Sequence, residues 1–153
     1  MIEDEDHVYI VMEHMKGGTL RHYMMTRKRH ISEEVIAKIG HQLVMALYYL
    51  SQMNVVHRDI KPDNILIKEP VADPFDIHTA PEIKLMDFGL SQYLGGNERS
   101  TLPFGTLTYV APEVISIIPY RFQVDMYSVG IVLYQLCTGH VPFDSSDEEH
   151  LIE

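Results

Sequence analysis

The sequence is poor in cysteine and in basic residues, and each shortage argues against a class of protein. Cys137 is the only cysteine among 153 residues, so no internal disulfide can form and a reducing, intracellular environment is expected. Lysine and arginine number 12 against 22 aspartate and glutamate residues, which gives a net charge of -10. This balance argues against a broad surface for nucleic acid or anionic membrane, and a basic or phosphate-containing substrate fits it better.

The sequence shows no signal for export or membrane insertion. Its first residues lack the charged, apolar and small-residue order of a signal peptide. No apolar run approaches the roughly 18 to 20 residues that a membrane-spanning helix requires. We therefore expect a cytoplasmic protein without a membrane or nucleic-acid partner.

The apolar residues are sufficient for one domain with a core, because they make up 46% of the chain. Residues 7–15, "HVYIVMEHM", are rich in β-branched and apolar side chains and predict a short buried strand that ends before Gly17 and Gly18. Short apolar runs at 65–67 and 83–86 predict two further strands, joined by a long irregular segment.

Helical periodicity dominates the rest of the chain. A helix is expected to begin near Thr19, and a second is expected over residues 32–53, where Ser32 can cap the first turn. Residues 124–138 are apolar nearly all round, which predicts a helix buried in the middle of the domain. The fold class is therefore predicted to be α+β, mainly α. The apolar face of the second helix is formed by Val35, Ile36, Ile39, Leu43, Ala46, Leu47 and Leu50.

Polar residues that suit phosphoryl transfer stand close together in "VVHRDIKPDNILI". Asp59 could accept a proton from a hydroxyl, and Lys61 could neutralise charge on the phosphate that this hydroxyl attacks. Asn64 offers a neutral oxygen ligand, and Asp87 in "LMDFGL" offers a second, followed by Gly89, which is expected to let the backbone turn sharply. Two oxygen ligands suit Mg²⁺, which usually keeps several waters and also binds substrate phosphates.

The segments "HRDIKPDN", "DFG", "GTLTYVAPE" and "DMYSVG" resemble, in order, the motifs of the eukaryotic protein kinase family. The resemblance implies that Asp59 is the catalytic base and that Asn64 and Asp87 bind Mg²⁺. Phe88 would be the residue whose packing separates active from inactive states. Lys61, together with Thr106 in the third motif, resembles the serine/threonine branch, which implies a protein substrate with a Ser or Thr hydroxyl.

The same resemblance implies an ATP-binding edge before the first predicted helix. "IVMEHMKGG" is similar to the hinge that holds adenine, with Met12 as gatekeeper. The backbone C=O of Glu13 and N–H of Met15 would form hydrogen bonds to adenine, and Leu66 would form the floor of its pocket.

Structural and regulatory roles follow for several other residues. Asp125 would hold the catalytic loop from the buried helix, and Glu113 would pair with an Arg that this sequence does not contain. His57 is interpreted as a packed residue that supports the loop, because the histidines show no metal-like pairing. The resemblance of Arg58 implies an activation segment that phosphorylation can order. The candidate phosphorylation sites are Ser100 and Thr101, with ordinary loop residues as an open alternative.

The resemblance covers the hinge and most of the large, C-terminal lobe. The Gly-rich loop, the strand Lys and the helix Glu that hold ATP phosphates in this family are absent from the sequence. We therefore expect residues 1–153 to be a partial kinase domain, with a hinge strand and linker at 1–18 and the large lobe at 19–153. A small lobe or upstream segment would be a partner, and the isolated chain is expected to be inactive. The subgroup is most similar to the calcium/calmodulin-dependent and calcium-dependent kinases. The alternative function is a kinase-like scaffold without catalysis.

Overall fold

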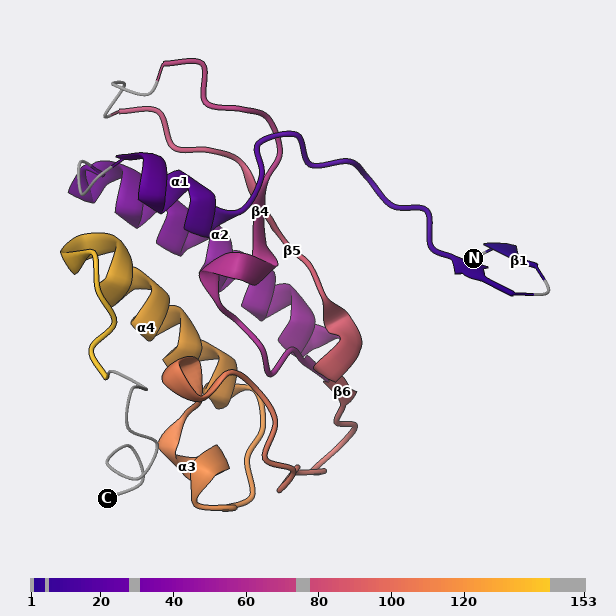
Figure 1. The fold of residues 1–153 in the computed structure, drawn as a ribbon. Helices are drawn as coiled ribbons and strands as arrows, with labels where there is room; N and C mark the ends of the chain where they lie inside the picture. The colour runs from indigo at the N-terminus through magenta and orange to yellow at the C-terminus, as the bar shows by residue number, and fades with distance from the viewer. Residues whose placement is uncertain (1, 5, 28–30, 74–77, 144–153) are drawn as a thin grey trace.

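The computed structural model describes residues 2–4, 6–27, 31–73 and 78–143. This part of the chain is a mixed α/β structure that is mainly helical, as the sequence predicts (Figure 1). Residues 144–153, which were assigned to the large lobe, lie outside it. The helices are α1 (Leu20–Arg27), α2 (Glu33–Gln52), α3 (Pro112–Ile115) and α4 (Gln123–Thr138). The strands are β1 (Ile2–Glu3), β2 (Val8–Tyr9), β3 (Val55–Val56), β4 (Ile65–Ile67), β5 (Ile83–Leu85) and β6 (Gln92–Tyr93).

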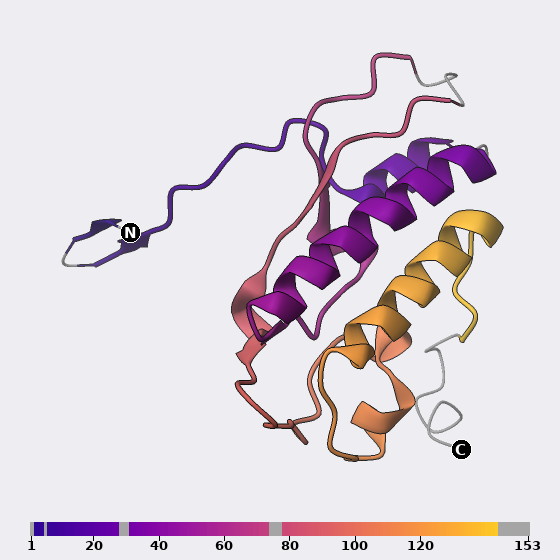
Figure 2. The same ribbon diagram turned by 180° about the vertical axis from the view of Figure 1, so that it is seen from behind.

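Helix α2 forms one wall of the core and confirms the predicted second helix. The Ser32 hydroxyl caps it by accepting a hydrogen bond from the Val35 N–H at 3.3 Å. Its predicted apolar face is buried or partly buried, and it packs along α4 (Figure 2). Gly40 permits this close packing, because a Cβ atom there would lie 3.2 Å from Leu133 of α4.

Helix α4 begins one residue before the predicted range 124–138 and ends with it, but it is not buried all round. Val129 and Val132 are buried in the core, whereas Met126 is 47% and Tyr134 is 42% exposed on the opposite side. The prediction of a fully buried helix is therefore wrong for this structure, because the core covers one face of α4 only. The helix ends at Gly139, whose φ of 81° is a left-handed conformation that glycine adopts readily.

Strands β4 and β5 form the antiparallel pair that supports the candidate site. Ile65 pairs with Leu85, and Ile67 pairs with Ile83, so the predicted strands are confirmed except that β5 ends one residue early. Ile65 and Ile67 point into the core, while Leu66 between them is only partly buried.

The first residues form an extended arm that projects from the helical body (Figures 1 and 2). Only Val8–Tyr9 of the predicted strand 7–15 is a strand, and it pairs with β1. Ile10, Val11 and Met12 are 71%, 81% and 67% exposed. The prediction of a buried strand is therefore wrong here, because no described residue outside β1 pairs with this segment. Backbone hydrogen bonds to the body resume where the Lys16 N–H donates to the Lys68 carbonyl at 2.9 Å and the Gly17 N–H donates to the Ile67 carbonyl at 3.0 Å.

None of the helices in the described ranges combines the length and the apolar character that a membrane span needs.

Candidate active site

Asp125 holds the loop that carries most of the candidate residues. This side chain, at the start of α4, is only 2% exposed. Its two oxygens accept hydrogen bonds from the backbone N–H groups of His57, at 2.7 Å, and Arg58, at 2.8 Å. Burial raises the pKa of Asp125 above 3.8, although these two hydrogen bonds act in the opposite direction. Helix α4 and the loop are thus joined through one carboxylate.

His57 connects the same loop to the segment after β5. Its ring is fully buried, and its Nδ1 accepts a hydrogen bond from the Asp59 N–H at 3.3 Å. Nε2 is therefore the donor to the Met86 carbonyl, 3.0 Å away. The edge of the ring packs against Phe88, with ring centroids 4.8 Å apart. These contacts fix the spacing between the Asp59 loop and the Asp87 segment.

Arg58 ties the loop to residues that follow Asp87. It has a left-handed backbone, with φ of 70°. Its Nε donates to the Leu90 carbonyl at 2.5 Å, and a terminal nitrogen donates to Gln92 Oε1 at 2.9 Å. The guanidinium also lies over the ring of Phe104, 4.7 Å from its centroid.

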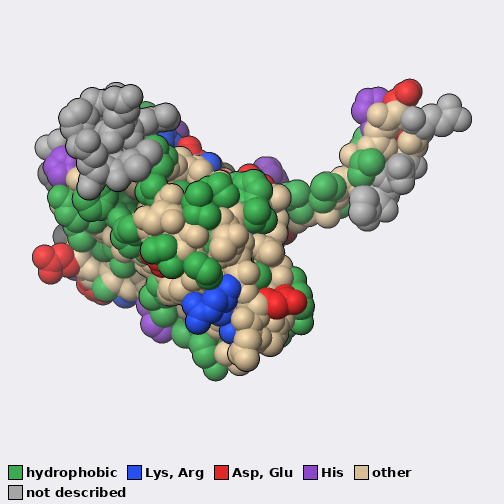
Figure 3. All heavy atoms as spheres, turned by 90° about the horizontal axis from the view of Figure 1, so that it is seen from below, with side chains coloured by type: hydrophobic (Ala, Val, Ile, Leu, Met, Phe, Trp, Pro, Cys, Tyr) green, Lys and Arg blue, Asp and Glu red, His purple; other side chains and the backbone are tan. Residues whose placement is uncertain are grey.

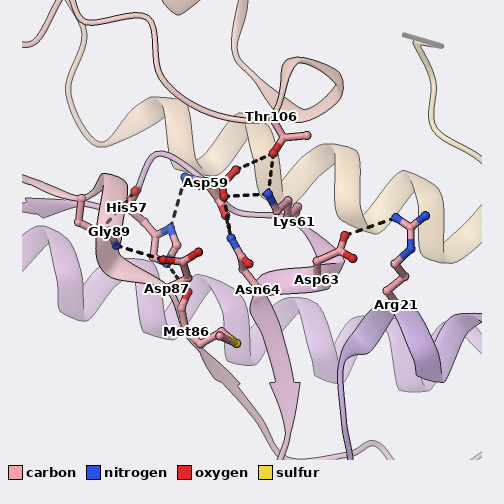
Figure 4. A network of polar contacts seen from close by, with 11 residues as sticks. Arg21, His57, Asp59, Lys61, Asp63, Asn64, Met86, Asp87, Gly89 and Thr106 are labelled. Atoms are coloured by element: carbon pink, nitrogen blue, oxygen red, sulfur yellow. Dashed lines mark hydrogen bonds and ion pairs between the residues drawn. The ribbon is translucent and has the colours of Figure 1, made fainter. Parts of the chain in front are cut away.

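Asp59 is the centre of a buried hydrogen-bond network (Figure 4). Its Oδ1 accepts from the Thr106 hydroxyl at 2.8 Å, and its Oδ2 accepts from the Asn64 amide at 2.8 Å. The Lys61 ammonium lies 2.9 Å from Oδ2 and donates to the Thr106 hydroxyl at 2.7 Å. Burial raises the pKa of Asp59, but the hydrogen bonds from Lys61, Thr106 and Asn64 and the Lys61 charge together lower it below 3.8. Asp59 is consequently ionised at neutral pH.

Two side chains whose oxygen atoms could bind a metal ion, Asn64 and Asp87, lie together at the end of the β4–β5 pair. The Met86 N–H donates to the Asn64 carbonyl at 2.9 Å, which places Asp87 beside Asn64 (Figure 4). The side chain of Asn64 uses its nitrogen for both bonds to Asp59, so neither bond engages its Oδ1. The Asp87 carboxylate is exposed. These donors fit Mg²⁺, which needs only one or two protein ligands beside substrate phosphates, and the described residues contain no cluster of three acidic, His or Cys ligands.

The sharp turn expected at Gly89 lies instead at Asp87. Asp87 has φ of 62°, in the left-handed region, whereas Gly89 does not have a positive φ. Asp87 Oδ1 accepts a hydrogen bond from the Gly89 N–H at 3.3 Å. The carboxylate stabilises its own turn, because aspartate is one of the few residues that tolerate this conformation.

A cleft of about 580 Å³ opens beside Lys61 and Thr106. On one wall Arg21 of α1 forms an ion pair with Asp63, with 3.4 Å between nitrogen and oxygen (Figure 4). Neither residue is predicted from the sequence, because nothing in their local pattern indicates a contact across 42 positions. Gly105 is likewise not predicted as a site residue, although a Cβ atom there would lie 2.7 Å from the Arg58 carbonyl oxygen.

The proposed adenine-binding residues lie in three parts of the structure, namely the arm, its junction with the body, and β4. Met12 is exposed on the arm, and the carboxylate of Glu13 forms an ion pair with Lys84 of β5. Met15 is partly buried near the point where the arm rejoins the body. Leu66 lies at a bridge with Thr19, on the side of β4 that faces away from the core. Their role in binding ATP stays a prediction.

The candidate regulatory residues differ in exposure. Ser100 is 2% exposed, which does not fit the expectation of an accessible phosphorylation site, whereas Thr101 is exposed. Glu113 is partly buried and forms no ion pair with any described residue.

Comparison with known proteins adds independent information. The family model for the protein kinase domain matches residues 1–153. An Aurora kinase of Yarrowia lipolytica is 38% identical over 141 residues, which cover 92% of this chain and 35% of that protein. The serine/threonine-protein kinase RAD53 of Saccharomyces cerevisiae is 36% identical over 162 residues, covering 97% of this chain and 19% of that protein. A probable myosin light chain kinase of Dictyostelium discoideum is 33% identical over 153 residues, which cover 100% of this chain and 37% of that protein. The chain thus spans between 19% and 37% of the length of these relatives.

Proposed function

The chain belongs to the protein kinase family, on its serine/threonine side, and from this membership we propose that it carries the catalytic segment of a kinase for protein Ser or Thr hydroxyls. Kinases of this family use ATP and Mg²⁺. The observation that carries the proposal is the network around Asp59, an ionised carboxylate held by three side chains beside an open cleft.

In the proposed reaction, Asp59 positions the substrate hydroxyl and accepts its proton. The hydroxyl oxygen forms a bond to the γ-phosphorus of ATP as the bond from that phosphorus to ADP breaks. Lys61, bound to both Asp59 and Thr106, is placed to neutralise charge on the transferred phosphoryl group. Thr106 and Asn64 keep the carboxylate oriented by donating to different oxygens.

Asn64 Oδ1 and the Asp87 carboxylate would hold Mg²⁺. The metal would neutralise charge on the ATP phosphates and fix their orientation. The hydrogen bond from the Met86 N–H to the Asn64 carbonyl keeps the Asp87 segment beside Asn64. A scaffold has no chemical need for a base and two metal ligands together, so these residues favour the enzyme over a scaffold.

The domain division is part of the same proposal. Residues 1–18 would be the hinge strand and linker, and residues 19–153 would be large lobe. Phosphate-binding groups would come from a small lobe, since the sequence contains no Gly-rich loop. The isolated chain would therefore show no useful transfer. The long segment at 68–82 supports the assignment to the calcium/calmodulin-dependent branch.

The test is phosphoryl transfer by a protein in which this chain follows a kinase small lobe. Radiolabelled ATP and a library of Ser/Thr peptides would be used with wild-type protein and with Asp59→Asn. We expect the variant to lose about 10²- to 10⁴-fold in rate, because it lacks the general base, while its circular dichroism is unchanged. Equal transfer by the two proteins contradicts the role of Asp59. Absence of transfer by both folded proteins contradicts the proposed activity.

A further inference from the structure

The base of the arm, residues 13–16, is held on the helical body by few contacts. The Lys16 N–H donates to the Lys68 carbonyl at 2.9 Å. Between Lys16 and the tip, one ion pair joins the described arm to the described body, from the ammonium of Lys84 to the carboxylate of Glu13, and no hydrogen bond besides this one does so. Figure 3 shows the arm leaving the body as a narrow extension with hydrophobic side chains along its stem. The Glu13–Lys84 pair is therefore the outermost polar contact between arm and body.

Lys84 lies on the face of the β4–β5 pair that points away from the core. It stands directly opposite Leu66 in the antiparallel register, and opposite residues of paired strands share a face. Lys68 is two positions from Leu66 and lies on the same face, where its ammonium binds the Glu82 carboxylate at 2.9 Å. Because Glu13 binds Lys84, the arm leaves the body on the face that carries Leu66.

The charges on this face are paired one to one. Lys68 has Glu82 as its partner, and Lys84 has Glu13 as its only acidic partner among the described residues. The hydrogen bond from Lys84 is the main cause of a pKa of Glu13 below 4.5, and the charges of Lys84 and Lys68 act in the same direction. Glu13 is therefore ionised at neutral pH. Both side chains of the Glu13–Lys84 pair are about half exposed, so the pair is a modest restraint that salt weakens.

The backbone next to this pair has two polar groups that no described residue binds. Neither the Glu13 carbonyl nor the Met15 N–H takes part in a hydrogen bond within the described part of the chain. Met15 is partly buried. Backbone N–H and C=O groups near buried surface ordinarily have partners, so this edge can accept a ligand that offers one donor and one acceptor.

We propose that Lys84 is a positioning residue for the nucleotide: by holding Glu13, it keeps the backbone of residues 13–15 beside the face that carries Leu66. Adenine offers an amino donor and ring-nitrogen acceptors, and it would then meet an apolar surface at Leu66 and a hydrogen-bonding edge at Glu13 and Met15 in one place. Lys84 itself would not touch the nucleotide. The contacts to adenine rest on the proposed function, whereas the restraint of the arm by Lys84 does not.

The restraint is measured on the full 153-residue chain by ¹⁵N relaxation of the amides of residues 13–15. We expect Lys84→Met to lower their order parameters toward the flexible range, below about 0.6, because Glu13 loses its partner. Lys84→Arg keeps the cation and should stay near the wild-type values. Lys38→Met removes a comparably exposed ion pair, with Glu34 on α2, and should have no effect. Equal order parameters in the wild type and Lys84→Met would overturn the restraint.

The positioning role is tested with adenosine, which contains the base but no phosphate and carries no charge at neutral pH. Its Kd is measured by isothermal titration with the protein of the transfer experiment, in which this chain follows a kinase small lobe. We expect Lys84→Met to raise the Kd about 1.5- to 5-fold, the effect typical of an exposed ion pair, and to raise KM for ATP equally without changing kcat. The difference should shrink in 1 M salt, where the Debye length is about 3 Å.

The charge swap Glu13→Lys/Lys84→Glu keeps the proposal open to refutation if Lys84→Met alters the fold. The swap restores an ion pair and should recover adenosine affinity relative to Glu13→Lys alone. An adenosine Kd that is the same in the wild type and Lys84→Met, or a lower kcat with unchanged KM, would overturn the positioning role. Absence of adenosine binding by the wild-type protein would overturn it as well. Adenosine binding without phosphoryl transfer would support the positioning role and contradict only the proposed activity.

Discussion

At the scale of single residues, the Thr106 hydroxyl does two things at once. It donates a hydrogen bond to Asp59 and accepts a hydrogen bond from the Lys61 ammonium. A hydroxyl can do this because it carries one donor and two acceptor lone pairs, whereas a carboxylate can only accept and an ammonium can only donate. Thr106 therefore connects the base to the cation without leaving a buried group unpaired.

Replacing Thr106 by Val tests this connection. The folded pKa of Asp59 lies below 3.8, so its stabilisation is present above pH 3.8 and is lost as the pH falls through the folded value. Thr106→Val removes one hydrogen bond that lowers this pKa, so the pKa should rise. Stability near pH 7 should fall by about 1.5 to 3 kcal/mol, the usual range for a hydrogen bond to a charged group.

The measurements for Thr106→Val are urea unfolding as a function of pH and carboxyl ¹³C titration of Asp59. Thr106→Ser keeps the hydroxyl and is the matched control, with a pKa near that of the wild type. An Asp59 pKa that is the same in Thr106→Val and Thr106→Ser would show that the hydroxyl does not govern the carboxylate.

At the scale of elements, α4 and the His57–Asn64 loop are joined mainly through Asp125. This joint places the loop on the core, although the loop contains only the short turn Pro62–Asn64 as regular structure. The arrangement also brings together two buried aspartates whose pKa values shift in opposite directions. Asp59 gains donors from three side chains, whereas burial dominates at Asp125.

Asp125→Asn is expected to show a pH dependence opposite to that of Thr106→Val. The pKa of Asp125 is raised in the folded state, so its titration stabilises the fold fully below pH 3.8 and loses this effect as the pH rises through the folded pKa. Asparagine does not titrate and leaves one backbone N–H without its acceptor, at a cost of about 1 to 3 kcal/mol. The difference in unfolding free energy, wild type minus variant, should therefore decrease as the pH rises from acid toward neutral. A difference that increases over this range in calorimetric unfolding would contradict the raised pKa.

The elements that the sequence predicts best are those whose signal is local. Helix α2 repeats apolar residues at helical spacing and has Ser32 before its first turn, so its bounds follow from neighbouring residues alone. Asp59, Lys61 and Asn64 fall within one short loop and were found in the same way. The exposed side of α4 was not predictable, because periodicity identifies an apolar face but does not say what covers it.

Other parts of the candidate site depend on contacts between distant residues. Arg58 and Gln92 are 34 positions apart, and the sequence around Gln92 contains no feature that indicates their hydrogen bond. Gly105 was quoted within a motif, but the need for glycine becomes clear only from its approach to the Arg58 carbonyl. Contacts of this kind follow from the tertiary structure, and residue spacing does not predict them.

At the scale of the whole molecule, an acidic chain carries an arm with an exposed apolar stretch at residues 10–12. The net charge of -10 favours separation of the molecules through repulsion. The arm exposes Ile10, Val11 and Met12 in extended backbone, which is a surface suited to pairing with another chain. Salt screens the charge repulsion between molecules without weakening apolar contact between their arms, so a change in salt concentration separates these two effects.

We expect the chain to self-associate through the arm, and to do so more strongly as salt concentration increases. Light scattering at several protein and salt concentrations measures this. Ile10→Thr/Val11→Thr/Met12→Gln should reduce the apparent mass. Tyr48→Gln removes a 58% exposed apolar residue from α2 and should not reduce it. A monodisperse wild-type monomer at all salt concentrations would rule out this role of the arm.

At Arg58 and Asp87, the two left-handed residues beside the candidate site, the side chain that the proposed chemistry needs is not the one that best suits the backbone conformation. Four residues other than glycine have positive φ in the described part of the chain, and Arg58 and Asp87 are two of them. Glycine at either position would relieve roughly 1 to 2 kcal/mol of backbone strain. It would also delete the guanidinium that binds Leu90 and Gln92, or the carboxylate beside Asn64. A laboratory screen that rewards only heat resistance would select glycine wherever this relief exceeds the stability that the lost contacts contribute, and it would then erode the candidate site. A screen for robust variants of this chain therefore has to hold Arg58 and Asp87 fixed.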